Sequence, residues 1–216
     1  MPKTKPTERA PGEKAAPTRD IILEAATKVF SGHPYHAASI RMIAAEGGFY
    51  HGLIRYHFPS KAGIFGTVVE SACRKLKEAN RLWLSEVAAL GPRDGLALYL
   101  DRFLEHYRAH PEIFRIVIQN LSQKDQEGVP GYHHLLDLLS GSQADFREIF
   151  TGLFDGDSAA RVLESFNALI IHYLGAADAE AWLLGMEPES PGYLEWVKET
   201  MLFVFLPVLE KTLALK

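Results

Sequence analysis

Apolar residues recur every three to four positions along almost the whole chain, which is the spacing of one buried helix face. The clearest run is Ile22, Ala25, Ala26, Val29 and Phe30. The strict apolar–polar alternation of a half-buried strand is nowhere sustained. Gly, Pro and Asp residues interrupt the periodic segments, and residues that favour helix N-caps, such as Ser39 and Ser60, precede two of them. The sequence therefore predicts an all-α protein.

The breaks between periodic segments give the expected boundaries of ten helices. These cover about 18–31, 39–47, 51–57, 60–90, 93–109, 112–122, 132–153, 158–174, 177–185 and 191–214. Residues 1–17 contain four prolines and almost no large apolar residue, so we expect a flexible tail. The chain then divides into residues 18–65 and a larger helical part, residues 66–216.

Composition narrows the functional class only a little. The 216 residues are 47% apolar and 23% charged, close to the average of globular proteins. One cysteine, Cys73, permits neither an intramolecular disulfide nor a CxxC metal site, so a reducing, cytoplasmic location is expected. No apolar run approaches the length of a membrane span, and the N-terminus lacks the apolar segment of a secretory signal.

Charge is distributed unevenly along the chain. Residues 1–61 carry nine Lys and Arg against five Asp and Glu, a formal charge of +4. The remaining residues carry 14 bases and 22 acids, a formal charge of −8, and the whole chain sums to −4. A basic segment in an acidic chain suggests that this segment contacts nucleic acid. The alternative is that Lys3, Lys5 and Lys14 lie in a solvated tail and do not indicate contact with nucleic acid.

Residues 39–58 have the pattern of a helix-turn-helix. A short helix, a glycine turn and a second short helix follow one another without a gap. Gly48 suits the turn because glycine adopts a positive φ without strain. Phe49 and Ile54 have the spacing of a hydrophobic staple, and Ile54 and Phe58, four residues apart, form the stripe that we expect to be buried.

The opposite side of the second short helix carries groups that suit the DNA major groove. Arg55 offers a guanidinium fork for guanine O6 and N7, Gly52 permits close approach, and Leu53 suits a thymine methyl group. His51 lies at the exposed N-terminal end. A helical hairpin with a solvated polar face remains the alternative.

Further polar groups near this helix suit DNA phosphates. Tyr56, His57 and Lys61 supply a hydroxyl, an imidazole and an ammonium group, and Lys61 begins a helix whose N-terminus attracts anions. Arg41, in the first turn of the preceding helix, is within reach of either a phosphate or a base edge.

Residues 19–65 resemble the N-terminal domain of TetR-type (TetR/AcrR) transcriptional regulators. The resemblance lies in Ile22, Ala25-Ala26 and Phe30, then in Ser39-Ile40, Ile43-Ala44 and Gly48, and then in GLIRYHFPSKAGIF over 52–65. The HF-x-SK run is its most specific part. The family implies a homodimer that binds a palindromic operator through a helix-turn-helix domain. It also implies release from DNA when a small molecule enters the larger helical domain.

The resemblance also assigns roles to single residues. It implies base or groove contacts by Arg41, His51, Gly52, Leu53 and Arg55, and phosphate contacts by Tyr56, His57 and Lys61. Three positions depart from the family pattern: Tyr50 replaces a small capping residue, Arg55 replaces a common Tyr, and Ala62-Gly63 replaces acidic residues at the start of the next helix. These departures prevent a prediction of the operator sequence.

The larger part of the chain is expected to form the dimer. The stretch 201–209 is apolar on all sides, so it must be covered from more than one direction. Family dimers pair through their last two long helices, which are 158–174 and 191–214 here. The expected interface residues are Phe166, Ile170, Val197, Met201, Val204, Phe205 and Val208. Core packing in a monomer is the alternative.

Aromatic residues on the middle helices suggest a pocket for an apolar or aromatic inducer. The candidate lining is Tyr99, Phe103, His106, Tyr107, Phe114, Ile118, Phe146, Phe150, Phe166 and Tyr173; Tyr132 belongs to the same aromatic set. Ordinary core packing is the more common explanation of such aromatic stripes.

No metal or other cofactor is expected. His106 and His110 have a metal-compatible spacing, but no third ligand is evident. The chain contains no G-x-S-x-G motif and no Gly-rich phosphate loop, so we do not expect an enzyme. The first alternative to a transcriptional regulator is a helical adaptor that does not bind DNA, and the second is an all-α enzyme. The expected partners are operator DNA, a second copy of the chain and a small molecule, with no membrane.

Overall fold

The computed structural model describes residues 18–121, 128–151, 154 and 156–214. Ten α-helices and no strand occur in these residues, which confirms the all-α prediction. The helices are α1 Thr18–Gly32, α2 Ile40–Gly47, α3 His51–His57, α4 Lys61–Val87, α5 Pro92–Ala109, α6 Pro111–Leu121, α7 Tyr132–Ile149, α8 Gly156–Gly175, α9 Ala177–Leu183 and α10 Pro191–Ala214. The expected tail, residues 1–17, lies outside the described residues.

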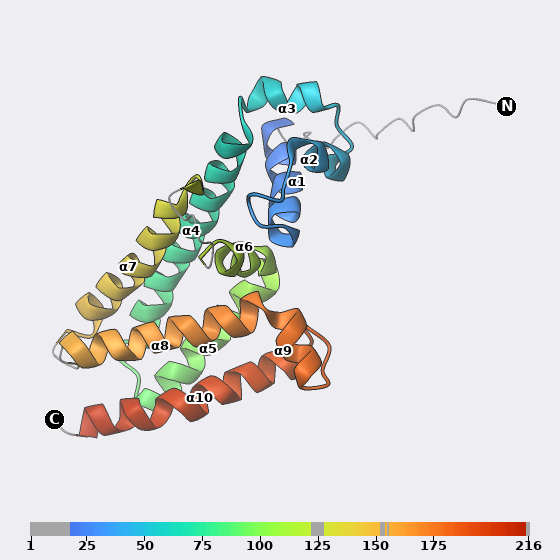
Figure 1. The fold of residues 1–216 in the computed structure, drawn as a ribbon. Coiled ribbons are helices and arrows are strands. Elements are labelled where there is room, and N and C mark those ends of the chain that lie inside the picture. The colour runs from blue at the N-terminus through green and yellow to red at the C-terminus, as the bar shows by residue number, and fades with distance from the viewer. Residues whose placement is uncertain (1–17, 122–127, 152–153, 155, 215–216) are drawn as a thin grey trace, which may run out of the picture.

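Helices α1, α2 and α3 gather at one end of the molecule (Figure 1). The long helix α4 starts directly after α3 and leads away from this end, with α7 packed along it. At the opposite end α10 packs against α5 and α8. Helix α6 lies between the two ends and contacts both α1 and α8. The three-helix unit α1–α3 is thus connected to the rest of the chain through α4 and α6.

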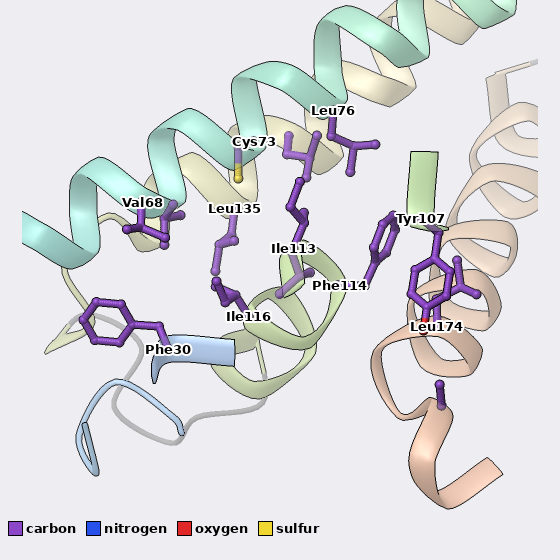
Figure 2. Packing of buried hydrophobic residues seen from close by; sticks show 14 of the residues in the cluster. Phe30, Val68, Cys73, Leu76, Tyr107, Ile113, Phe114, Ile116, Leu135 and Leu174 are labelled. Carbon is purple, nitrogen blue, oxygen red and sulfur yellow. The ribbon is translucent and has the colours of Figure 1, made fainter. Parts of the chain in front are cut away.

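The hydrophobic core is continuous between these parts. Figure 2 shows Phe30 of α1 close to Val68 of α4, and then Ile113 and Ile116 of α6 beside Leu135 of α7. Phe114 of the same helix α6 lies near Tyr107 of α5. Because apolar burial is the main force that holds helices together, this shared core packs the three-helix unit firmly onto the larger part.

Most observed helix ends agree with the glycine, proline and capping signals. Helix α4 ends at Val87, where the prediction reached residue 90, and α7 ends at Ile149, where it reached residue 153. After α4 the backbone N–H of Leu90 donates to the carbonyl of Val87, which forms a turn before Gly91-Pro92. Over the described residues, no helix combines the length and the apolar character that a membrane crossing requires.

Candidate nucleic-acid interface

The turn between α2 and α3 is fixed by a cap at each end of α2. The Ser39 side chain accepts a hydrogen bond from the N–H of Met42 at 3.2 Å, which caps the N-terminus. Gly48 has φ 67°, the left-handed conformation expected from the sequence, and its N–H donates to Ala44 and Ala45 carbonyls. These two residues set the direction in which α3 leaves the turn.

Gly47 has a separate role that the sequence pattern did not reveal. The ring of Phe49 folds back over it, so that a Cβ at residue 47 would lie 2.0 Å from a ring carbon. Such a distance is far below van der Waals contact. Only glycine therefore allows Phe49 to pack against the core directly before α3.

Helix α3 has the buried and exposed faces that the sequence predicts. Ile54 and Phe58 are buried in the core with the other helices of the unit. Arg55 lies on the exposed side, and the Tyr56 side chain next to it is 84% exposed. Leu53 is also exposed. Figure 1 shows α3 at the outer end of the molecule, where a groove of DNA can approach it.

Both arginines of this surface and one of its two histidines face solvent. Arg41, in the first turn of α2, and His51, at the start of α3, are both exposed. Neither Arg41 nor Arg55 forms an ion pair with any residue that the structure describes. His57 is half-buried, and its ring lies 5.1 Å from that of Tyr56. Free guanidinium groups on a protruding helix are available to an external anion or base edge.

Tyr50 is a candidate contact residue that sequence reasoning missed. It is 75% exposed, forms no side-chain cap of α3, and places its ring 4.6 Å from the ring of His51. A Cβ at Gly52 would lie 2.8 Å from the same Tyr50 ring. The space over Gly52, which we expected to admit DNA, is therefore filled by Tyr50. The unusual residue at the capping position was the available signal.

Lys61, which was predicted to contact a phosphate, forms contacts within this chain. Its Nζ donates to the backbone carbonyls of Tyr35 at 2.8 Å and Ala38 at 2.9 Å. The same atom lies 4.2 Å from the centre of the Tyr35 ring. Burial lowers the pKa of the ammonium group. Two of the three ammonium donors are thus used within the chain, and Lys61 holds the α1–α2 connection.

The α1–α2 connection is also held by α6. Gln119 Nε2 donates to the carbonyl of Ser31 at 2.7 Å, and the N–H of Tyr35 donates to Asn120 Oδ1 at 3.4 Å. Asn120 in turn donates through Nδ2 to the carbonyl of Ile116. A shift of α6 would therefore pull directly on the three-helix unit.

A cavity of about 130 Å³ lies between α4, α5, α7, α8 and α10. Four of the predicted pocket residues line it: Tyr99, Phe146, Phe150 and Phe166. An adjoining cavity of about 30 Å³ is lined in part by Phe103 and Phe114. Both cavities share the polar residues Asn80, Tyr99, Ser142 and Asn167. The pattern also missed lining residues at the ends of helices, including Leu84, Val87 and the Gly91-Pro92 turn.

The other four predicted pocket residues line neither cavity and pack elsewhere. Tyr107 is fully buried against Phe114, and the His106 ring lies 5.4 Å from the Trp83 ring. Ile118 lies against Gly175, and Tyr173 packs on Trp196. Helical spacing alone could not separate these faces, because each of them is apolar. His106 and His110 have ring centres 5.1 Å apart, and the described residues supply no third ligand for a metal.

The predicted dimer residues are mostly inside the subunit, which corrects the expectation from sequence. Phe166 and Ile170 of α8 and Val197, Met201 and Phe205 of α10 are all buried in the core of this chain. The three α10 residues lie on a helix that packs against α5 and α8, and the Phe205 ring contacts that of Phe166. Only Val204 and Val208 of the predicted set are exposed.

Phe203 lies beside these two exposed valines and was not predicted. Its side chain is 81% exposed, against 39% for Val204 and 45% for Val208. We refer to Phe203, Val204 and Val208 as the α10 patch. A phenylalanine this exposed in the middle of a long helix is typical of a surface that another protein covers.

Comparison with known proteins finds a family match in the N-terminal part of the chain. Residues 22–68 match the model of the tetR family of bacterial regulatory proteins. The HTH-type transcriptional repressor SCO4008 of Streptomyces coelicolor is 31% identical over 100 residues, which are 46% of this chain and 47% of the relative. The HTH-type transcriptional repressor NicS of Pseudomonas putida is 30% identical over 112 residues, 51% of this chain and 52% of the relative. The match thus spans about half the length of these curated relatives.

Solved structures extend the likeness of the fold to most of the chain. A transcriptional regulator from Rhodococcus sp. Rha1, RHA1_ro04179, has a TM-score of 0.64 at 18% identity and covers 89% of this chain and 97% of that one. The matched family and these relatives are transcriptional regulators and not enzymes. The tetR-family match thus falls on residues 22–68, which lie in α1–α4, and over most of the chain the likeness to solved structures is one of fold.

Proposed function

We propose that this chain is a transcriptional repressor that binds a palindromic DNA operator as a homodimer and releases it when a small molecule binds. The observation that carries the proposal is the exposed side of α3, where unpaired Arg55 stands beside Tyr56 on a helix anchored by buried Ile54 and Phe58. In this proposal residues 18–65 read DNA, and residues 66–216 bind the ligand and form the dimer. We place the protein in the cytoplasm, where bacterial DNA lies.

In the proposed complex α3 enters the major groove. Arg55 would pair with O6 and N7 of a guanine, and Leu53 would contact a thymine methyl group. Tyr50 and His51, at the N-terminal end of α3, would reach base edges beside it. Tyr56 and His57 would contact phosphates and fix the register of the helix, and Arg41 would approach from α2. We leave Lys61 out of the proposed interface because two of its three donors already bind the carbonyls of Tyr35 and Ala38.

A homodimer is proposed because one short recognition helix covers only a few base pairs. Two copies related by a two-fold axis would place their α3 helices in successive major grooves, about 34 Å apart. The α10 patch supplies an exposed apolar surface for such pairing, and the same patch on both subunits satisfies two-fold symmetry.

Release by a ligand is proposed because the cavity and the DNA-reading helix share α4. The C-terminal half of α4 lines the cavity through Asn80, Leu84 and Val87, and its N-terminus follows α3 after three residues. A ligand that selects a different position of α4 would change the spacing of the two α3 helices. The hydrogen bonds from α6 to the α1–α2 connection offer a second route for the same change.

Selection of binding sites from random duplex DNA tests the DNA-binding part. The full chain is mixed with a random library, bound DNA is recovered, and the enriched sequences are compared. We expect a palindrome whose half-sites lie one helical turn apart. If a folded protein enriches no sequence at any salt concentration, the proposal fails and the adaptor alternative is favoured. If it enriches a single non-palindromic site, the homodimer part fails.

A reporter placed behind the recovered site separates repression from activation. The proposal expects reporter expression to fall when this protein is produced. A rise in expression would retain DNA binding but contradict repression.

A further inference from the structure

We infer that the ligand of the α4–α5–α7–α8–α10 cavity is an uncharged, single-ring molecule with one hydrogen-bond acceptor that Asn167 binds. The inference rests on the proposed function, because it names the chemistry of the molecule that would release DNA. Three independent features of the cavity carry it: its size, its lack of charge and its unpaired amide.

Size limits the ligand to about one ring. The main cavity measures about 130 Å³ and its neighbour about 30 Å³. An engineered apolar cavity of about 150 Å³ is known to hold one benzene molecule. Pockets for drug-sized ligands are several times larger. One ring therefore fits the main cavity, with a small substituent directed toward the junction with the second.

The walls suit an aromatic ring. The rings of Phe146 and Phe150 are 4.8 Å apart, and Phe154 lies 5.3 Å from Phe146. In a second aromatic group of the lining, Phe166 lies 5.6 Å from Tyr99 and 5.3 Å from Phe205. Tilted and edge-on aromatic contacts at these distances are favourable, and a bound ring would add further contacts of this kind.

The described lining contains no charged group. Neither cavity is lined by Asp, Glu, Lys, Arg or His among the residues that the structure describes. A buried carboxylate or ammonium group of a ligand would lose its water and gain no partner of opposite charge. The cavity thus selects against ionised ligands.

The polar groups at the junction leave a donor for the ligand. Tyr99 donates its hydroxyl to Asn80 Oδ1 at 2.5 Å, and Ser142 donates to the carbonyl of Leu138. Burial raises the pKa of the Tyr99 phenol, which keeps it a neutral donor. Asn167 lines both cavities, and its Nδ2 is buried with no hydrogen-bond partner among the described residues. Since an unpaired buried donor is costly, a ligand acceptor that reaches it gains affinity.

Three probes of similar shape test the inference on the full-length protein. Acetophenone is neutral and carries an acceptor, ethylbenzene is neutral without one, and benzoate is ionised. Calorimetry and thermal shift should show acetophenone binding roughly tenfold more tightly than ethylbenzene, as one additional hydrogen bond predicts. Benzoate should show no binding at the same concentration. The inference is overturned if the wild-type protein binds the two neutral probes equally, prefers benzoate, or binds none of the three.

Substitution of Asn167 tests whether this residue causes the tighter binding of acetophenone. Asn167→Leu keeps the side-chain volume and removes the donor, so acetophenone should lose its advantage while ethylbenzene binds as before. Ser165→Leu, on the exposed side of α8, is the control and should keep the advantage. An advantage that persists in Asn167→Leu would contradict the assigned donor.

A parallel measurement of DNA binding separates this inference from the proposed function. If acetophenone binds but operator DNA stays bound, the ligand chemistry stands and ligand-induced release fails. If DNA binds and no neutral probe does, the regulator stands and the ligand chemistry fails.

Discussion

The ammonium group of Lys61 is held by two backbone carbonyls and one aromatic ring. From sequence, this lysine at a helix N-terminus next to α3 suggested a phosphate contact. The structure instead directs it toward the connection between α1 and α2. Lys61 thus stabilises the packing of the three-helix unit that carries α3. We expect its loss to lower the free energy of unfolding more than the affinity for DNA.

Replacement of Lys61 with methionine should lower the free energy of unfolding by about 2 kcal/mol, because two charge-assisted hydrogen bonds are lost. Urea denaturation measures this change. Lys75→Met, on the exposed side of the same helix, should change stability by less than about 0.5 kcal/mol. If Lys61→Met is as stable as the wild type and only the salt dependence of DNA binding falls, the phosphate role is correct.

Cys73 should resist thiol reagents in the folded protein. Its side chain projects from α4 and is buried (Figure 2). Burial, together with the nearby charge of Asp137, raises the pKa of the thiol to about 12. The reactive thiolate is therefore scarce at mildly alkaline pH. Labelling by a chromogenic disulfide should be roughly 100-fold slower in buffer than in concentrated urea. Equal rates in the two conditions would mean that α4 opens readily or that Cys73 is exposed.

At the scale of elements, the α2–α3 turn depends on one residue with a positive φ. Gly48 has φ 67°, which costs a residue with a Cβ about 1 kcal/mol. Gly48→Ala should therefore lower the free energy of unfolding by this amount. Gly66 is the control, because it is helical and has open space where a Cβ would project. Gly66→Ala should raise stability by about 0.5–1 kcal/mol. Chemical denaturation measures both changes. If the two substitutions change the free energy of unfolding in the same direction, the turn does not depend on the positive φ of Gly48.

The elements themselves could be predicted because their ends are marked by single residues. Ser39, Gly48 and Ser60 cap or end helices through local chemistry, so sequence alone was sufficient to locate them. The buried stripe of α3 was equally clear, since Ile54 and Phe58 are apolar residues beside polar ones.

The orientation of α10 could not be predicted for a physical reason. Between Met201 and Leu209 almost every side chain is apolar, so helical periodicity gives no preferred face. Tertiary packing against α5 and α8 decides that Met201 and Phe205 are buried and Phe203 is exposed. The aromatic set of α5 presents the same difficulty, because its spacing does not separate Tyr99, which lines the cavity, from Tyr107, which packs against Phe114. Leu84 of α4 lines the same cavity without belonging to any aromatic pattern.

At the scale of the whole molecule, the α10 patch should hold two copies together. Phe203→Glu places a charge where the proposed two-fold contact buries an apolar ring, so the dimer should dissociate at least roughly tenfold more readily. Light scattering over a range of concentrations measures the change. Leu82→Glu, at an exposed leucine of α4, is the control and should leave the dimer intact. A wild-type monomer, or dissociation by Leu82→Glu alone, would contradict the placement of the interface.

At the scale of the whole molecule, positive and negative charges are also separated along the chain. The segment that contains α1–α3 is basic, and the remainder of the chain is acidic. Long-range repulsion between the acidic part and DNA would favour approach by α3. In the proposed function, the continuous core would carry a change around the cavity to that helix through α4 and α6.

The central claim is that α3 reads DNA through Arg55, and a titration of the selected operator with variant proteins tests it most directly. Arg55→Ala should cost about 1–3 kcal/mol of binding free energy and lose discrimination at one base pair in each half-site. Arg93→Ala, which removes the same charge from an exposed site on α5, should bind with unchanged affinity and preference. If Arg55→Ala keeps full affinity and full sequence preference, α3 is not the helix that reads the operator.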